Sequence, residues 1–309
     1  MTTEKRAVIG PGLMGHGIAL VLAKVPGSVW LYGISDQTLE TAMERIRQSL
    51  EQLTRHGLVS EAEQIINRIH PTTDLAEAVT EARFVIEAVP ENLSLKQQLF
   101  TELEKLAPAD AILATNSSGL PIKESTSSIK SGWRVVGSHF FLPAQIIPLV
   151  EVSRGPETSE ATLAWTCDHW RACGKEPIRI EKDLPGYIAN RMQGALVREA
   201  THLLNSGVAS AEDIDKAVRM GFGLRYLVSG PLEQRDLGGL DLHVALAEEL
   251  WPHLDRSSGP FPLVRQMVER GELGLKTGKG FYDWSAADEH VVRDEKYEAL
   301  LKLMAQLGL

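Results

Sequence analysis

The sequence predicts an α/β protein in which a doubly wound parallel sheet precedes an all-helical domain. Two observations lead to this expectation. Short apolar runs alternate with helical segments up to about residue 182, which is the pattern of a parallel sheet with crossover helices. Beyond Asp183–Gly186 these runs stop and long amphipathic stretches follow. We therefore place the first domain at residues 1–183 and the helical domain at residues 184–309.

A glycine-rich turn, Gly10-Pro11-Gly12-Leu13-Met14-Gly15, directly follows the apolar run Ala7–Ile9. A strand, such a turn and a helix together place backbone N–H groups and a positive helix end beside a diphosphate. Gly10 permits the tight turn, Gly12 lets the backbone approach the pyrophosphate, and Gly15 lets the helix lie close to the strand. The first domain is therefore expected to be a Rossmann-type dinucleotide-binding domain.

The remaining elements of the first domain are also recognisable in the sequence. One helical stretch, near residues 39–67, interrupts the alternation and is expected to be an inserted helical hairpin. The second domain begins with a helical face made by Ile188, Met192, Leu196 and Leu203. The expected strands are Val29–Tyr32, Phe84–Ile86, Ala111–Ala114, Val135–Gly137 and Leu149–Val152.

Composition excludes several classes of protein. The 309 residues are 43% hydrophobic, enough for a sizeable core, and carry a formal net charge of −9. Nucleic-acid binders need a basic surface, so we expect no nucleic-acid partner. The sequence shows no secretion signal and no apolar stretch of spanning length, which favours a cytoplasmic protein with no membrane partner. Cys167 and Cys173 lack zinc-site spacing, and no metal site is expected.

Polar residues at the carboxyl ends of the later strands are the candidates for chemistry, because open α/β sheets bind their ligands there. Ser118, His139 and Glu151 occupy such positions. A histidine beside a buried acid suits alcohol oxidation, which needs a base for the hydroxyl proton. Taken singly, each residue has a structural alternative. His139 could be a hydrogen-bonded core histidine, Glu151 a structural acid with its hydrogen bonds satisfied, and Ser118 a turn residue or helix cap.

Seven ordered motifs make the chain resemble the 3-hydroxyacyl-CoA dehydrogenase family over nearly its whole length. Several separated motifs in one order are far more specific than any single one. The motifs are I-G-P-G-L-M-G-H-G-I-A (9–19), E-A-V-P-E-N-L-S-L-K (87–96), T-N-S-S-G (115–119), G-S-H-F-F-L-P (137–143), L-V-E-V (149–152), D-L-P-G-Y-I-A-N-R (183–191) and K-T-G-K-G-F-Y-D-W (276–284).

The resemblance implies roles for individual residues. His139 matches the catalytic histidine, and Glu151 matches the acid paired with it. Ser118 and Asn190 match the residues that orient the substrate oxygen. The implied reaction oxidises a secondary alcohol β to a carbonyl, with hydride passing to a nicotinamide cofactor. The cofactor-binding residues expected from the turn and the resemblance are Gly10, Gly12, Leu13, Met14, Gly15, Asp36, Glu91, Lys96 and Asn116.

Two departures from the family pattern concern the cofactor. Gly33 stands where an aspartate normally grips the adenosine ribose, and Leu142 stands where the family usually has asparagine. Asp36 is a candidate to reach the ribose instead, while Ser35 would tolerate a 2′-phosphate. No arginine directly follows the strand, so we expect NAD and leave NADP open.

A third departure concerns the substrate. The segment around Glu51–Leu58 lacks the lysines with which acyl-CoA members meet the coenzyme's phosphates. Gly223–Pro231 resembles the corresponding segment of the subgroup that handles small free hydroxy acids, such as gulonate dehydrogenase, the λ-crystallin relative. Arg225 is there a candidate clamp for a substrate carboxylate, with an ion pair as the alternative. We expect a small L-3-hydroxy acid or its CoA thioester as substrate, with the free acid favoured.

The sequence also bears on the oligomeric state and on two alternative classes of protein. The helical domain resembles the family's dimerisation domain, which implies a homodimer. A competing possibility is a non-catalytic NAD(H)-binding structural protein, although such a role needs no combination of serine, histidine, glutamate and asparagine. The lysine-dependent β-hydroxyacid dehydrogenases share the glycine turn, but they need a lysine where this chain has Asn190.

Overall fold

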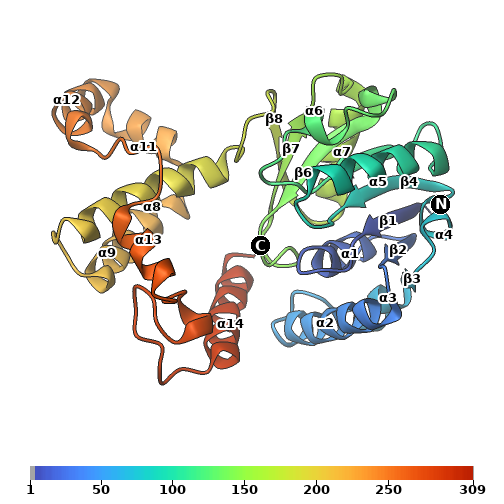
Figure 1. The fold of residues 1–309 in the computed structure, drawn as a ribbon, viewed down its shortest axis with the longest axis horizontal. Coiled ribbons are helices and arrows are strands. Elements are labelled where there is room, and N and C mark those ends of the chain that lie inside the picture. Colours follow the sequence, from blue (N-terminus) through green and yellow to red (C-terminus); the bar gives the residue numbers. More distant parts are fainter. Residues whose placement is uncertain (1–3, 309) are drawn as a thin grey trace. The chain divides into compact units, whose positions relative to one another are not determined.

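The computed structural model describes residues 4–308. The chain folds into two compact units (Figure 1). The first contains the chain up to Ile188 together with the segment from Tyr297 onward, and the second contains Ala189–Lys296. Among the described residues, no helix is both long enough and apolar enough to cross a bilayer.

The first unit is built on one sheet of eight strands in the order β3-β2-β1-β4-β5-β6-β7-β8. Neighbouring strands pair in parallel, except for β6 and β7, which are antiparallel. This is the doubly wound, Rossmann-like arrangement that the sequence predicts. The strands are β1 (Lys5–Ile9), β2 (Ser28–Tyr32), β3 (Ile69–Thr72), β4 (Ala82–Glu87), β5 (Ile112–Thr115), β6 (Val135–Phe140), β7 (Leu149–Arg154) and β8 (Glu176–Ile180).

Helices cover both faces of this sheet. One apolar cluster contains residues of α1, α2 and α7, and a second contains residues of α4 and α5. The strands that contribute to both clusters are therefore apolar on both faces, as buried parallel strands require. The helices are α1 (Gly15–Ala23), α2 (Asp36–Arg55), α3 (Ala62–Asn67), α4 (Leu75–Val79), α5 (Leu93–Leu106), α6 (Ile122–Ser125), the 3₁₀ turn η1 (Gly132–Arg134) and α7 (Glu160–Ala172).

The second unit is helical, as the sequence predicts. Within residues 189–296, only Thr201 and Met267 are buried, so this unit has almost no core of its own. Its elements are α8 (Ala189–Asn205), α9 (Ala211–Ala217), the π-helical turn η2 (Val218–Phe222), α10 (Gly223–Tyr226), α11 (Pro231–Gly238), α12 (Leu240–Leu250), η3 (Trp251–His253), α13 (Pro262–Glu269), η4 (Leu275–Thr277) and the first part of α14 (Glu289–Leu307).

The last helix, α14, belongs to both units. From Tyr297 onward it packs into the first unit, where Leu301 and Met304 join the apolar cluster of α1 and α2. His56 Nε2 also lies 2.8 Å from Glu298 Oε1. The first unit therefore extends to Ile188 and includes the end of the chain, whereas the sequence assigned everything from residue 184 to the second domain. A helix's periodicity shows that it has an apolar face but not which core receives that face.

The strands β3 and β8 and the antiparallel direction of β7 were not predicted from the sequence. The residues of β3, Ile-His-Pro-Thr, lack an apolar run, and β8 alternates only weakly. The antiparallel direction of β7 follows from the short connection after β6, which leaves no room for a crossover helix. The helical insertion expected near residues 39–67 consists of α2 and α3.

Candidate active site and cofactor pocket

The glycine turn has the geometry that a dinucleotide requires. Gly10 has φ +106°, and a Cβ there would lie 2.7 Å from the carbonyl oxygen of Ala88. A Cβ on Gly15 would lie 1.7 Å from the Gly10 oxygen, so α1 can begin here only with glycine. A Cβ on Gly12 meets no atom within 4 Å. The protein itself therefore does not need glycine at position 12, whereas close backbone approach of a pyrophosphate would.

A pocket of about 1030 Å³ opens beside this turn. It is large enough for a cofactor, and the fit is supported by the open space in front of Gly12 and the N-terminus of α1. Asp36 is exposed on the first turn of α2 and does not line this pocket; Gln37 and Thr38 line it instead. The sequence-predicted residues in the lining are Gly10, Gly12, Leu13, Met14, Glu91, Lys96, Asn116 and Ser118.

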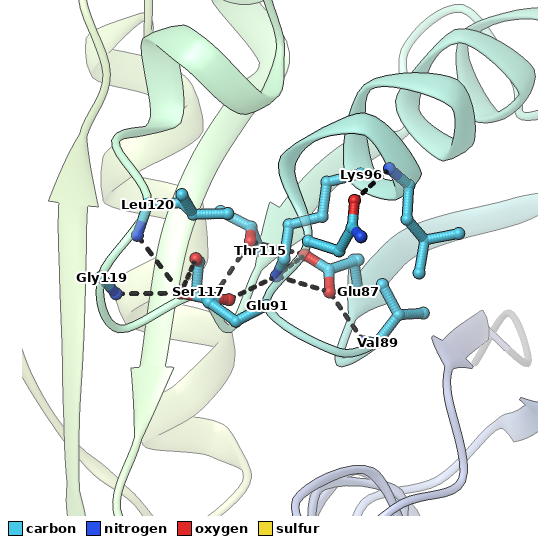
Figure 2. A network of polar contacts seen from close by, with 10 residues as sticks. Glu87, Val89, Glu91, Lys96, Thr115, Ser117, Gly119 and Leu120 are labelled. Carbon is cyan, nitrogen blue, oxygen red and sulfur yellow. Dashed lines mark hydrogen bonds and ion pairs between the residues drawn. The ribbon is translucent and has the colours of Figure 1, made fainter.

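A buried carboxylate at the end of β4 connects the elements around the pocket (Figure 2). Glu87 is fully buried and accepts hydrogen bonds from Lys96 Nζ at 2.9 Å and from Thr115 Oγ1 at 2.7 Å. It also accepts from the backbone N–H of Val89 at 2.7 Å. A buried charge persists only when it is paired and hydrogen-bonded, and these contacts satisfy that condition. They tie the ends of β4 and β5 to α5.

Glu91 extends this network to the loop that carries Ser118. Its Oε1 accepts from Ser117 Oγ at 2.5 Å and from the N–H of Gly119 at 2.9 Å, and its Oε2 lies 3.0 Å from Lys96 Nζ. Burial alone would raise the pKa of Glu91, but the hydrogen bonds and Lys96 lower it to about 2. The loop is thereby held in place while the Ser118 side chain stays exposed on the pocket wall.

The structure also shows which contacts Lys96 and Asn116 make. The Lys96 ammonium is buried between the carboxylates of Glu87 and Glu91, so it shapes the pocket through them. Asn116 accepts a hydrogen bond on Oδ1 from the backbone N–H of Phe140 at 2.9 Å. Its side chain therefore links the end of β5 to the end of β6, one residue beyond His139.

His139 and Glu151 face each other across the antiparallel strands β6 and β7. They are direct partners in the register, and His139 Nδ1 lies 2.8 Å from Glu151 Oε2. An ionised Glu151 can only accept, so Nδ1 carries the proton and Nε2 is left with a free lone pair. A histidine held in this way by an ionised carboxylate can act as a base through Nε2.

The surroundings of this pair include residues that the sequence alone did not single out. The ring of Tyr187 lies with its centroid 5.4 Å from that of His139, and Phe141 makes an edge contact at 4.8 Å. The backbone N–H of Ile188 donates to Glu151 Oε1 at 2.9 Å. Tyr187 has φ +46°, which is unusual for a bulky residue and is tolerated where surrounding contacts fix it. Its place in the D-L-P-G-Y motif was the only available signal.

The loop after β6 is anchored by a buried lysine, Lys175, which the sequence did not single out. Lys175 Nζ donates to the carbonyl oxygens of Ala144 and Ile147 at 2.7 and 2.8 Å. Burial lowers the pKa of Lys175 to about 7. Leu142, at the start of this loop, is 42% exposed and presents an apolar side chain where the family pattern has an amide.

Asn190 and Arg225, the remaining predicted site residues, lie in the second unit. Asn190 is half-buried on the first turn of α8, and Arg225 is exposed on α10. Among the described residues of its own helical unit, the Arg225 guanidinium makes no ion pair.

Comparison with known proteins decides the family. Residues 5–184 match the family model of the 3-hydroxyacyl-CoA dehydrogenase NAD-binding domain, and residues 186–284 match that of its C-terminal domain. The chain belongs to the 3-hydroxyacyl-CoA dehydrogenase family. It is an NAD-dependent dehydrogenase that acts on a CH–OH group, and the pocket beside the glycine turn lies in its NAD-binding domain.

Relatives within the family differ in their named substrates. The chain is 32% identical to 5-formyl-3-hydroxy-2-methylpyridine 4-carboxylate 5-dehydrogenase of Mesorhizobium japonicum, over 96% of this chain and 95% of the relative. A crystal structure of an enzyme of that name, described as an NAD⁺-dependent dismutase, has a TM-score of 0.92 at 31% identity and covers 99% of both chains. A probable 3-hydroxybutyryl-CoA dehydrogenase of Bacillus subtilis is 36% identical over 92% of this chain and 98% of the relative.

A third relative gives a structural contrast. The crystal structure of (S)-3-hydroxybutyryl-CoA dehydrogenase from Ralstonia eutropha has a TM-score of 0.75 at 31% identity. It covers 92% of this chain and 99% of its own. At the same sequence identity, the acyl-CoA enzyme therefore matches less of this chain than the pyridine-carboxylate enzyme does.

The depressed pKa of Glu91 predicts a pH-dependent stability. Because this pKa is about 2 in the folded state against an ordinary 4.5, the carboxylate stabilises the fold above about pH 4.5, and this contribution disappears as the pH falls through 2. We expect Glu91→Gln to lower the melting temperature most at neutral pH, with the gap to the wild type closing between pH 4.5 and 2. Thermal unfolding across this range measures the gap. The control is Glu40→Gln, which changes an exposed carboxylate. A difference in melting temperature between Glu91→Gln and the wild type that stays constant with pH would contradict the lowered pKa of Glu91.

Proposed function

We propose that this dehydrogenase oxidises the 3-hydroxyl group of a small L-3-hydroxy acid to the 3-keto compound, with His139 as the base and Glu151 as the residue that orients it. The observation that carries the proposal is the contact of 2.8 Å between His139 Nδ1 and Glu151 Oε2. With Nδ1 held as a donor, Nε2 accepts the hydroxyl proton, and the carboxylate stabilises the imidazolium that forms.

The cofactor and the remaining polar groups complete the proposed chemistry. NAD, when bound, accepts the hydride that leaves the carbinol carbon. Gly10, Gly12 and Gly15 form the turn that would hold its pyrophosphate. In this proposal Ser118 and Asn190 orient the reacting oxygen, and the reduction of the ketone follows the same proton path in reverse. The Ser118 side chain is exposed and lines the pocket, and its hydroxyl makes no hydrogen bond to another described residue. This supports its proposed role of orienting the oxygen.

Replacing either member of the pair tests this mechanism. We expect His139→Gln and Glu151→Gln each to lower kcat by about 10²- to 10⁴-fold, because general-base catalysis contributes on that scale. The affinity for NADH, measured by fluorescence titration, should change little. His70→Gln, an exposed histidine on β3, is the control and should keep full activity. Intact turnover by His139→Gln would refute the mechanism.

A free carboxylate is favoured over a CoA thioester for three reasons. The segment around Glu51–Leu58 contains no lysine to meet CoA phosphates. Arg225 carries a guanidinium without an ion pair among the described residues of its own helical unit, and such a group can bind a carboxylate through two parallel hydrogen bonds. A solved structure that matches this chain with a TM-score of 0.92 belongs to an enzyme named for a pyridine carboxylate. The alternative, a 3-hydroxybutyryl-CoA dehydrogenase, is favoured by the similarity to the Bacillus subtilis relative.

A substrate panel distinguishes the two possibilities. We expect faster turnover with short free 3-hydroxy acids, or with an aromatic hydroxy carboxylate, than with 3-hydroxybutyryl-CoA. On the preferred free acid, Arg225→Ala should raise KM by about ten- to a hundredfold with a smaller change in kcat, since it removes a charged hydrogen bond. Arg219→Ala, an exposed neighbour, is the matched control. Fast turnover that requires CoA would overturn the free-acid assignment.

We also propose that the helical unit forms a homodimer. A unit of residues 189–296 with only two buried side chains cannot be stabilised by its own core. Apolar side chains on α11 and α12 are largely exposed, including Leu232 at 82% and Leu237 at 78%. Apolar patches of this kind mark association surfaces. A second copy of the chain is the proposed occupant, as expected for the family.

Sedimentation velocity tests the dimer. We expect a single species of twice the chain mass at micromolar concentration. Leu232→Glu combined with Leu237→Glu should shift the sample toward monomer, because two buried charges at an interface are costly. Glu248→Gln on α12 is the control. A monodisperse wild-type monomer would contradict the proposal.

The sequence left open a non-catalytic NAD(H)-binding protein, but membership of the dehydrogenase family does not support that alternative. The alignment of His139 with Glu151 argues against it, since a structural protein needs no base with a fixed tautomer. A cytoplasmic location remains part of the prediction from sequence.

A further inference from the structure

The adenosine end of the cofactor pocket differs from the usual dinucleotide site. In these folds an acidic residue after the second strand normally hydrogen-bonds the ribose hydroxyls, and its charge opposes a 2′-phosphate. This chain has Gly33 there, directly after β2. We propose that Pro11 and Gly33 form a matched steric pair that excludes this acid, so that the enzyme distinguishes only weakly between NAD and NADP.

The steric part of the proposal rests on distances around Gly33. A Cβ at this position would lie 2.8 Å from Pro11 Cγ and 3.0 Å from Cγ and Cδ2 of Leu39. The first distance is shorter than real Cβ contacts allow, and the others are tight. The backbone of Gly33 is not left-handed, so the obstacle to a larger residue is crowding by neighbouring side chains.

Neither neighbour can withdraw easily. The Pro11 ring is rigid, and it sits in a turn whose Gly10 N–H donates to the carbonyl oxygen of Tyr32 at 3.0 Å. Gly33 itself donates to Thr72 O at 3.1 Å, which fixes the end of β2 against β3. Leu39 is buried in the core of the first unit. The glycine turn and the end of β2 are therefore held at a spacing that leaves no room for a side chain at position 33.

The part of the pocket lining that residues 32–45 contribute carries no negative charge. The pocket residues from Tyr32 to Arg45 are apolar, neutral polar or basic, and Asp36 is not among them. Gln37 and Thr38 offer uncharged hydrogen-bonding groups, and Arg45 adds a cation from the same helix. A 2′-phosphate would meet no carboxylate from this segment, while a 2′-hydroxyl would lose its usual acceptor. Both effects bring the affinities for the two cofactors closer together.

The first experiment tests the steric pair without any cofactor. We expect Gly33→Ala to lower the melting temperature by about 5 °C in the wild-type background, because overpacking a tight site is destabilising. In the Pro11→Ala background the same change should cost clearly less, since the tightest contact is gone. An equal loss of melting temperature in both backgrounds would show that Pro11 does not crowd position 33.

The second experiment tests cofactor recognition by titrating NADH and NADPH fluorescence with the full-length protein. For the wild type we expect dissociation constants within about tenfold of each other. Pro11→Ala combined with Gly33→Asp should tighten NADH relative to NADPH by about ten- to a hundredfold, the range for a charged hydrogen bond. Gly33→Asp alone should shift this ratio much less. Pro11→Ala alone is the control and should leave it near the wild-type value.

Either of two outcomes would overturn the proposal. A wild-type protein that binds NADPH more than about a hundredfold more weakly than NADH would show that the site is selective without the acid. A ratio for Gly33→Asp equal to that of the double variant would show that Pro11 is not the obstacle. Because binding is measured without substrate, these results do not depend on the proposed hydroxy-acid activity.

Discussion

The buried ion pair between Glu87 and Lys96 is the interaction on which the first unit's functional edge depends. Glu87 ends β4 at the point where the chain passes the glycine turn, and the backbone N–H of Ala88 donates to the carbonyl oxygen of Ile9 at 2.8 Å. Through Lys96, Thr115 and Glu91, the same network fixes the loop that carries Ser118. One desolvated carboxylate therefore ties the end of β4, which lies beside the glycine turn, to the loop that carries Ser118, and leaving it unpaired would be costly.

The contact between His139 and Glu151 depends on a different feature of the fold. An antiparallel pairing within an otherwise parallel sheet places His139 directly opposite Glu151, and the turn at Tyr187–Ile188 supplies a further donor to the acid. The Asn116 side chain connects this region to the strand beside the pocket. The pocket beside the glycine turn and the contact between His139 and Glu151 are thus built separately and are joined at the carboxyl ends of β5 and β6. This explains how the chain can depart from the family pattern at Gly33 and Leu142 while its histidine and acid remain aligned.

Much of the site could be predicted because its residues follow apolar runs that signal buried strands. Gly10 and Gly15 were assigned their geometric roles from the motif alone, and the structure gives each the close backbone contact that the motif implies. The sequence did not foresee that Lys96 is enclosed by two carboxylates, that Lys175 anchors the loop after β6, or that Asp36 lies outside the pocket. Each depends on which side chains meet across the fold, and periodicity carries no such information.

By itself, the sequence determined the fold class, the order of the two parts and the family, because glycine geometry, strand spacing and several ordered motifs are local properties of the chain. Only the tertiary structure decided that the end of α14 joins the first unit and that Pro11 and Leu39 fill the space beside Gly33. These outcomes depend on packing between segments far apart in the chain. A side chain's neighbours become fixed only when such segments compete for the same volume.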